Sequence, residues 1–235
     1  MTVKHLSSQF DTDLTDICTE VLQMGGLVEA QVQSAIRALE TFDVAFADQV
    51  IAAEARVNRQ EIEIDAHCSN IIARRQPTAR DLRLLLAISK SITNLERVGD
   101  EAYKIAKRSK RIIGEVARST IEFSEIRRSA ALAAEMLRKA LDAFARQDST
   151  SAAAIVRDDR ALDEEFRSFV RKLMSYMMEN PKLISVSLDY LFIAKAIERI
   201  GDHATNIAEF TIYVAKGTDV RHIDQEALEQ EANKP

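Results

Sequence analysis

The sequence is poor in residues that interrupt helices. Its 235 residues include only 6 Gly and 3 Pro, and one of these prolines is the last residue. A β-rich fold with many tight turns uses both residues freely, so this composition disfavours such a fold. Alanine, leucine, isoleucine, arginine and glutamate are abundant instead, and they suit helices. We therefore expect an all-α protein.

The sequence also lacks features of secreted, membrane-spanning and nucleic-acid-binding proteins. Its 2 cysteines, Cys18 and Cys68, form neither a CxxC motif nor a metal-binding spacing, which indicates reduced thiols in a cytoplasmic protein. The start, MTVKHLSSQF, contains no apolar stretch of the signal-peptide type, and no run approaches the roughly 18 apolar residues of a membrane helix. The net charge of −5 gives no overall attraction to nucleic acid or anionic lipid. We expect a cytoplasmic protein with no nucleic-acid partner and no direct membrane insertion.

Helical periodicity extends over nearly the whole chain, from Leu14 to Ala215. The breaks are few and short, and they separate six long segments. We expect helices at about 12–41, 44–75 and 77–113, then a fourth ending near 146, a fifth following 148 and a sixth starting at 181.

Residues that favour helix starts lie at four of the breaks. Asp43 and Asp148 are good N-caps for the second and fifth helices. Pro77 suits the first turn of the third helix, where its missing N–H matters least. Asn180 is a candidate cap for the sixth helix, with Pro181 as its first residue.

The two halves of the sequence repeat each other. ERVGD at 96–100 recurs as ERIGD at 198–202, inside matching helical patterns. A constant spacing of 105 residues relates three further pairs: Asp43 and Asp148, Glu54 and Asp159, and Val57 and Leu162. Such self-similarity indicates an internal duplication, and three long helices with short connections pack as an antiparallel bundle. We predict two tandem three-helix bundles, at 10–113 and 117–215, followed by a loose polar tail at 216–235.

The repeated motif places two carboxylates beside the core of each bundle. Glu96 and Asp100 each follow a position of the apolar stripe, so they lie about 100° around the helix from it. Glu198 and Asp202 have the same relation to the sixth helix. The glycine before each Asp lies on the stripe itself, where it costs about 1 kcal/mol against alanine. We expect this glycine to allow close approach of a neighbouring helix.

A second acidic pair on the preceding helix could face each of these pairs. The candidates are Glu54 and Asn58 in the first half, and Asp159 and Asp163 in the second. Carboxylates gathered in this way repel one another unless a cation neutralises them, and ligation by oxygen alone suits Mg²⁺, Ca²⁺, Mn²⁺ or ferric iron. The alternative is a solvated face, because a single ExxxD is common on helices and surface ion pairs contribute little.

Other motifs are less informative. Glu61 and Asp65 also form ExxxD but have no acidic counterpart in the second half, so we interpret them as surface residues. His203 could join a metal site, although a polar surface position fits it better. The sequence has no Gly-rich phosphate loop, no GxSxG motif and no Cys/His dyad, which argues against an enzyme.

Taken together, the repeated motifs resemble the PhoU family of bacterial phosphate regulators. The resemblance extends from about Phe10 to about His222. It rests on QMGGLVEAQ, RRQPTARDLRLLLAISKSI, LERVGDEAYKIAKR, YMMENP and AKAIERIGDHATNIAEF, in that order. The duplicated ERxGD and the RQPTARDLR connection are the most specific of these stretches.

The resemblance implies multinuclear metal clusters held by paired E(D)xxxD motifs. Carried over, the clusters would use Glu96 and Asp100 with Glu54 and Asn58, and Glu198 and Asp202 with Asp159 and Asp163. Asn58 departs from the acidic pattern, so the first site should be the weaker one. The metal would be divalent or ferric, and Fe, Zn, Mn, Mg and Ni all remain open.

The resemblance also implies a regulatory role without catalysis. Family members restrain the phosphate-starvation response and link the ATPase subunit of the phosphate ABC transporter to a sensor histidine kinase. We expect both proteins as partners, and a homodimer. One alternative is a carboxylate-bridged metalloenzyme in a helical bundle, but such enzymes use Glu-x-x-His pairs, which none of the acidic motifs provides. Another is a helical scaffold whose acidic pairs bind nothing.

Overall fold

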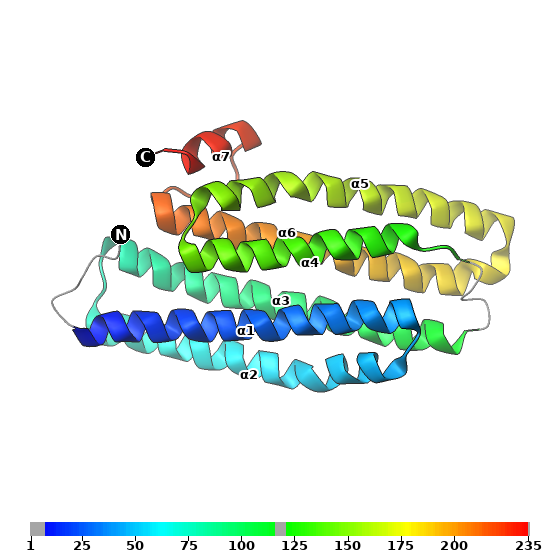
Figure 1. Cartoon of the computed structure of the whole chain (residues 1–235), viewed down its shortest axis with the longest axis horizontal. Coiled ribbons are helices and arrows are strands. Elements are labelled where there is room, and N and C mark those ends of the chain that lie inside the picture. Colours follow the sequence, from blue (N-terminus) through cyan, green and yellow to red (C-terminus); the bar gives the residue numbers. More distant parts are fainter. Residues whose placement is uncertain (1–7, 116–120, 235) are drawn as a thin grey trace.

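The protein is built from helices that run side by side along its length (Figure 1). The computed structural model describes residues 8–115 and 121–234, and within these ranges it contains no strand. This confirms the predicted all-α class and the tandem three-helix bundles. The helices are α1 (Ser8–Thr41), α2 (Val44–Arg75), α3 (Ala79–Gly114), α4 (Ser124–Arg146), α5 (Ser149–Glu179), α6 (Ile184–Lys216) and α7 (Gln225–Ala232).

Helices α1 to α3 form the first bundle, and α4 to α6 form the second. The two bundles lie against each other lengthwise, with α3 and α6 forming the most extensive helix pair (Figure 1). Apolar side chains from all six long helices form one continuous core. Among the described residues, no helix is both long enough and apolar enough to span a bilayer.

Two of the predicted N-caps are confirmed. The Asp43 side chain accepts a hydrogen bond from the backbone N–H of Ala45 at 2.9 Å, at the start of α2. The Asp148 side chain accepts one from the backbone N–H of Ser151 at 3.0 Å, at the start of α5. Each cap satisfies a donor that the helix itself cannot pair, so the two helix starts are encoded locally in both copies.

The two proline predictions need correction. Pro77 precedes α3, which begins only at Ala79, because Thr78 is extended and occupies the N-cap position of α3. Pro181 begins a short 3₁₀ helix, Pro181–Leu183, and α6 starts after it at Ile184. The Asn180 side chain therefore caps the 3₁₀ turn rather than α6 itself.

Buried ion pairs join the two bundles across the contact between α3 and α6. Glu101 of α3, which is buried, accepts a hydrogen bond from Arg199 of α6 at 3.2 Å. Asp189 of α6, also buried, accepts one from Arg108 of α3 at 2.7 Å, and Arg111 approaches it at 3.4 Å. Because a buried carboxylate is unfavourable without a partner, these contacts hold α3 and α6 in one register.

The C-terminal segment differs from the loose tail that we expected. Val220, Leu228 and Ala232 are buried, so α7 packs on the second bundle. Ser149 at the start of α5 donates a hydrogen bond to the carbonyl oxygen of Ala232 at 2.7 Å. The few apolar residues in this polar stretch are enough to dock it. The predicted start of the second unit, residue 117, lies outside the described residues.

Candidate metal centre

Two glycines bring neighbouring helices together at the repeated motif. A Cβ on Gly201 would overlap Leu162 of α5, and one on Gly99 would lie 3.4 Å from Val57 of α2. Leu162 and Val57 are equivalent residues of the duplication, so corresponding residues face the two glycines, with the tighter contact in the second bundle. This confirms the role that the sequence predicted for the two glycines. It also places the acidic positions of paired helices at the same level.

In the second bundle, the four predicted carboxylates influence one another. Asp159 Oδ1 lies 3.4 Å from the position that a Cβ of Gly201 would take. Burial raises the pKa of Asp159 to about 6, and the charges of Asp202, Asp163 and Glu198 add to the shift. The structure therefore brings the α5 and α6 pairs into one electrostatic neighbourhood.

Nearby cations partly balance this acidic group. Burial raises the pKa of Asp202, Glu198 adds to the shift, and Lys195 opposes it. Lys195 donates to Glu198 Oε1 at 2.6 Å, and Arg167 donates to Asp163 at 3.2 Å. Both cations come from the helix that carries their partner, and both are exposed at the surface. They can swing away, so the ion pairs do not block access to the carboxylates.

In the first bundle, the acidic arrangement is different. Burial raises the pKa of Glu96, and the charges of Asp100 and then Glu61 add to the shift. Arg97 lies 3.6 Å from Glu96 and 3.7 Å from Asp100. The α2 carboxylate that most affects Glu96 is thus Glu61, and not the predicted Glu54.

The predicted α2 members still lie beside the close approach of α2 and α3. Glu54 and Asn58 flank Val57, the residue that faces Gly99. Tyr103 is the main cause of the raised pKa of Lys107, and Glu54 contributes weakly to the same shift. The first set therefore has fewer mutually close carboxylates than the second.

The predicted ligands offer only oxygen atoms, which suit a hard cation. The structure does not gather their side chains around one point. Among residues 8–115 and 121–234, no three His, Cys, Asp or Glu side chains are placed together as metal ligands. Burial together with neighbouring carboxylates raises the pKa of three of the predicted donors, Glu96, Asp159 and Asp202. Side chains would have to move to bring three of these donors to one ion. The metal sites remain a prediction.

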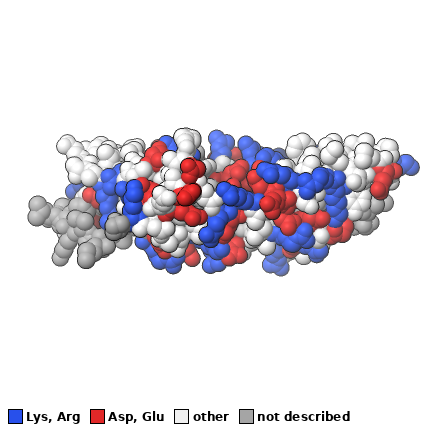
Figure 2. Space-filling model, turned by 90° about the horizontal axis from the view of Figure 1, so that it is seen from above, with Lys and Arg blue, Asp and Glu red and all other residues white. Residues whose placement is uncertain are grey.

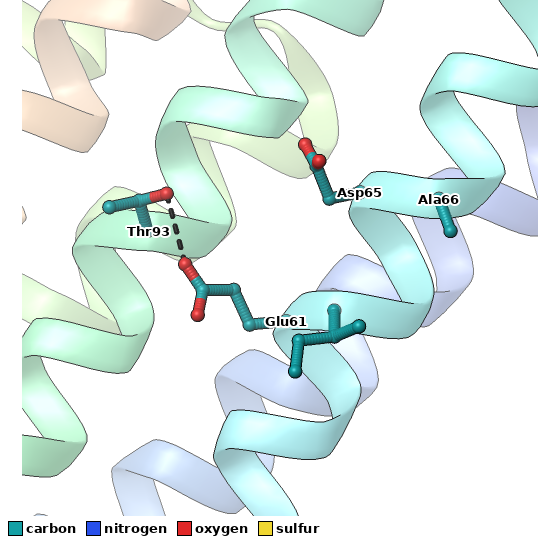
Figure 3. Close-up of a pocket in the computed structure, with 5 residues that line it drawn as sticks. Glu61, Asp65, Ala66 and Thr93 are labelled. Atoms are coloured by element: carbon teal, nitrogen blue, oxygen red, sulfur yellow. Dashed lines mark hydrogen bonds between the residues drawn. The ribbon is translucent and has the colours of Figure 1, made fainter.

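Glu61 and Asp65, which we interpreted as surface residues, line a hollow between α2 and α3 (Figure 3). Its volume is about 430 Å³. Thr93 of α3 donates to Glu61 at 3.1 Å, and Ser89 donates to Asp65 at 2.6 Å. The sequence did contain a signal, because residues 54, 58, 61 and 65 follow one face of α2.

His203 does not face the acidic group. Its Nδ1 atom lies 3.0 Å from Asn94 Oδ1 on α3, and Asn206 donates to the same oxygen at 3.0 Å. Burial lowers the pKa of His203 to about 4, and the charge of Arg199 adds to the shift. His203 is therefore a neutral contact between the bundles, and not a free surface residue.

Two similar three-helix units, each with an acidic pair and a packing glycine at the same place, define a duplicated helical protein with an oxygen-rich surface site. Comparison with known families agrees with this description. The model of the PhoU domain matches residues 21–109 and again 126–211, once in each bundle. The chain belongs to the PhoU family.

Named relatives match over almost the whole chain. A phosphate-specific transport system accessory protein PhoU homolog from Burkholderia sp is 56% identical over 97% of this chain and 98% of its own length. The phosphate-specific transport system accessory protein PhoU of Escherichia coli (strain K12) is 43% identical over 97% of this chain and 93% of its own.

Solved structures of the family have the same fold. The crystal structure of PhoU from Pseudomonas aeruginosa is 44% identical, covers 89% of this chain and all of its own, and has a TM-score of 0.86. The phosphate transport system regulatory protein PhoU from Streptococcus pneumoniae is 26% identical, with 90% and 99% coverage and a TM-score of 0.82. A regulatory role in phosphate uptake follows from this membership.

Proposed function

We propose that this protein is a cytoplasmic, non-enzymatic regulator that restrains the phosphate-starvation response when phosphate is plentiful. The observation that carries the proposal is the match of both bundles to the PhoU domain, together with relatives named as accessories of phosphate-specific transport. The absence of motifs for a nucleophile or a phosphate loop from the sequence supports a role without catalysis. Signalling would then proceed by protein contacts.

The partners would be the ATPase subunit of the phosphate ABC transporter and a sensor histidine kinase, and the protein itself would be a homodimer. An exposed apolar stripe on α6 supports binding to other proteins. Ile184, Leu188 and Phe192 follow one another at intervals of four residues, and all three are exposed. Apolar side chains in such a row are typical of a contact surface for a partner helix.

Cations border this α6 stripe. The guanidinium carbon of Arg108 lies 4.0 Å from the centre of the Phe192 ring. Arg111 on the next turn of α3 is exposed and also lies near Asp189. A partner segment with apolar residues and carboxylates would complement this surface. Exposed Met174 and Met178 on α5 add apolar area toward the same end of the molecule.

The charge distribution elsewhere fits recognition of proteins better than recognition of nucleic acid. Figure 2 shows acidic and basic side chains mixed over the middle of the visible face, and less charged areas toward both of its ends. A nucleic-acid-binding surface would instead be a continuous basic patch. The mixed surface and the net charge of −5 support protein partners.

We propose that metal ions bound at the two acidic sets are part of this regulatory function. The second site would use Asp159, Asp163, Glu198 and Asp202, whose shared excess of negative charge a cation would relieve. The first would use Glu54, Asn58, Glu96 and Asp100, with Fe, Zn, Mn, Mg and Ni as candidate ions for both. A bound ion would join neighbouring helices electrostatically.

Affinity purification from phosphate-replete cells tests the proposed partners. Tagged protein should co-purify with the transporter ATPase and the kinase, both identified by mass spectrometry. Leu188→Glu should abolish this recovery by placing a charge in the α6 stripe. Leu86→Glu is the matched control, because Leu86 and Leu188 are each 41% exposed on different helices. Failure to recover either protein with the wild type would contradict the proposal.

A further inference from the structure

The duplication allows the buried face of α1 to be compared with that of α4. Buried positions on the two helices correspond at a spacing of 105 residues, the spacing that also relates Glu54 to Asp159. The corresponding pairs are Val21 and Ile126, Met24 and Ser129, Gly25 and Ala130, Val28 and Ala133, Val32 and Leu137, Ala35 and Ala140, Ala38 and Ala143, and Leu39 and Phe144. By the same spacing, Gln31 corresponds to Met136.

Gln31 is thus an amide at a core position where the second bundle has an apolar side chain. It is only 3% exposed, and Met136 is buried as well. Neither Oε1 nor Nε2 of Gln31 has a hydrogen-bond partner among the described residues. Buried polar atoms in proteins are nearly always paired, so an amide with both ends unpaired requires an explanation.

The Gln31 amide lies where α1 packs against the close contact of α2 and α3. Its Oε1 atom is 3.2 Å from the position that a Cβ of Gly99 would take, and Val57 lies 3.4 Å from the same point. The residues that follow Gly99 and Val57 are Asp100 and Asn58, two members of the first acidic set. The amide therefore contacts the level of the bundle from which two members of the first acidic set project.

The two bundles differ in their oxygen ligands at two positions, and the two differences offset each other. The second set has four carboxylates, and its core position holds Met136. The first set has lost one carboxylate at Asn58, and its core position holds Gln31. An amide oxygen is a good neutral ligand for a hard cation, so Gln31 could restore the number of oxygen donors.

We propose that Gln31 Oε1 contacts the cation bound between α2 and α3, past Gly99, where no Cβ separates the amide from the neighbouring helices. This inference rests on the proposed metal binding and adds a donor that the ExxxD pattern does not contain. It explains why the first bundle tolerates Asn58. It also explains why a buried amide occupies a core position whose counterpart is methionine.

Two substitutions test the proposal in opposite directions. Gln31→Met reproduces the second bundle and should stabilise the ion-free protein, because it removes unpaired polar atoms from the core. The same change should lower the Mn²⁺ affinity of the first site about 10-fold or more. Gln31→Glu, which keeps the length and adds charge, should raise that affinity. A role limited to packing or to a buried water would leave the affinity unchanged in Gln31→Met.

The first site can be measured alone in the full-length chain carrying Asp159→Asn and Asp202→Asn, which disable the second. Mn²⁺ titration by calorimetry gives the affinity, and thermal unfolding with and without Mn²⁺ gives the ion-dependent shift. Met136→Leu is the control and should leave both unchanged. Unchanged Mn²⁺ affinity in both Gln31 variants would overturn the inference while leaving metal binding intact. Lack of Mn²⁺ binding by the unmodified protein would instead remove the metal proposal and this inference together.

Discussion

Gly201 of α6 and Leu162 of α5 approach so closely that no Cβ fits between them. Gly201→Ala should therefore destabilise the protein by about 1–3 kcal/mol, because the core must shift to accept a methyl group. Gly99→Ala should have a smaller effect, since its nearest neighbours lie at 3.2 and 3.4 Å. Urea unfolding measures both changes.

Gly26→Ala is the control for these glycine substitutions. Gly26 lies within α1 and has nothing within 4 Å of its Cβ position. Alanine there should stabilise the helix by up to about 1 kcal/mol. Equal effects at Gly26 and Gly201 would show that helix propensity, and not close packing, determines the response.

The raised pKa of Asp159 predicts how the stability of the metal-free protein depends on pH. The folded pKa of about 6 exceeds the reference value of 3.8, so folding disfavours the ionised carboxylate. The contribution of Asp159 to the stability of the folded protein is most favourable below about pH 4, and it is lost as the pH rises through 6. Asp159→Asn should therefore gain stability over the wild type between pH 4.5 and 8, by on the order of 1 kcal/mol after allowance for solvent screening.

Urea unfolding at the two pH values, in the presence of a chelator, checks this expectation. Asp158→Asn is a suitable control, because the neighbouring Asp158 pairs with Lys139 at 3.4 Å. A difference between wild type and Asp159→Asn that stays constant with pH would show that Asp159 titrates normally.

The contact between Arg108 and Asp189 predicts a large effect from losing one partner. Arg108→Met should destabilise the protein by roughly 2 kcal/mol, below the 3–5 kcal/mol typical of a broken buried pair, since Arg111 remains nearby. Arg111→Met should have a smaller effect, because Arg111 is more exposed and 3.4 Å from Asp189. Chemical denaturation that ranks Arg111→Met above Arg108→Met would contradict this account.

Because Asn58 stands where the second bundle has Asp163, we predict that the two metal sites differ in ion affinity. Asn58→Asp adds the missing carboxylate and should raise the ion affinity of the first site, whereas Asp163→Asn should lower that of the second. Metal analysis after equilibrium dialysis at limiting Mn²⁺ measures both effects. If neither substitution changes metal content under limiting or saturating Mn²⁺, the acidic residues are ordinary surface charges.

Much of the fold could be predicted from the sequence because its signals are local and repeated. The caps at Asp43 and Asp148 depend on one side chain and the next few backbone N–H groups. The packing of Gly99 and Gly201 followed from their place on an apolar stripe. By contrast, Pro77 was misplaced because the extended Thr78 that follows it delays the start of α3 to Ala79.

The remaining features depend on contacts between distant segments. Leu228 docks α7 through only a few apolar residues, too few for a clear periodic signal. Burial raises the pKa of Glu96 on α3, and the charge of Glu61 on α2 adds to the shift. In the sequence, only the polar face of α2 that includes Glu54 and Glu61 indicated this interaction. Gln31 sits in an ordinary apolar pattern, and its unpaired amide became evident only once α1, α2 and α3 were packed.

The central claim is that this protein restrains the phosphate-starvation response, and one measurement tests it most directly. A starvation-responsive phosphatase reporter is followed in high-phosphate medium, in the native host with and without the gene. Deletion should switch the reporter on, and the wild-type gene supplied in trans should silence it again. A gene that carries both Glu198→Lys and Asp202→Lys is supplied in the same way. It should fail to silence the reporter if the second acidic set is required for the restraint. A reporter that stays silent in the deletion strain would contradict the account.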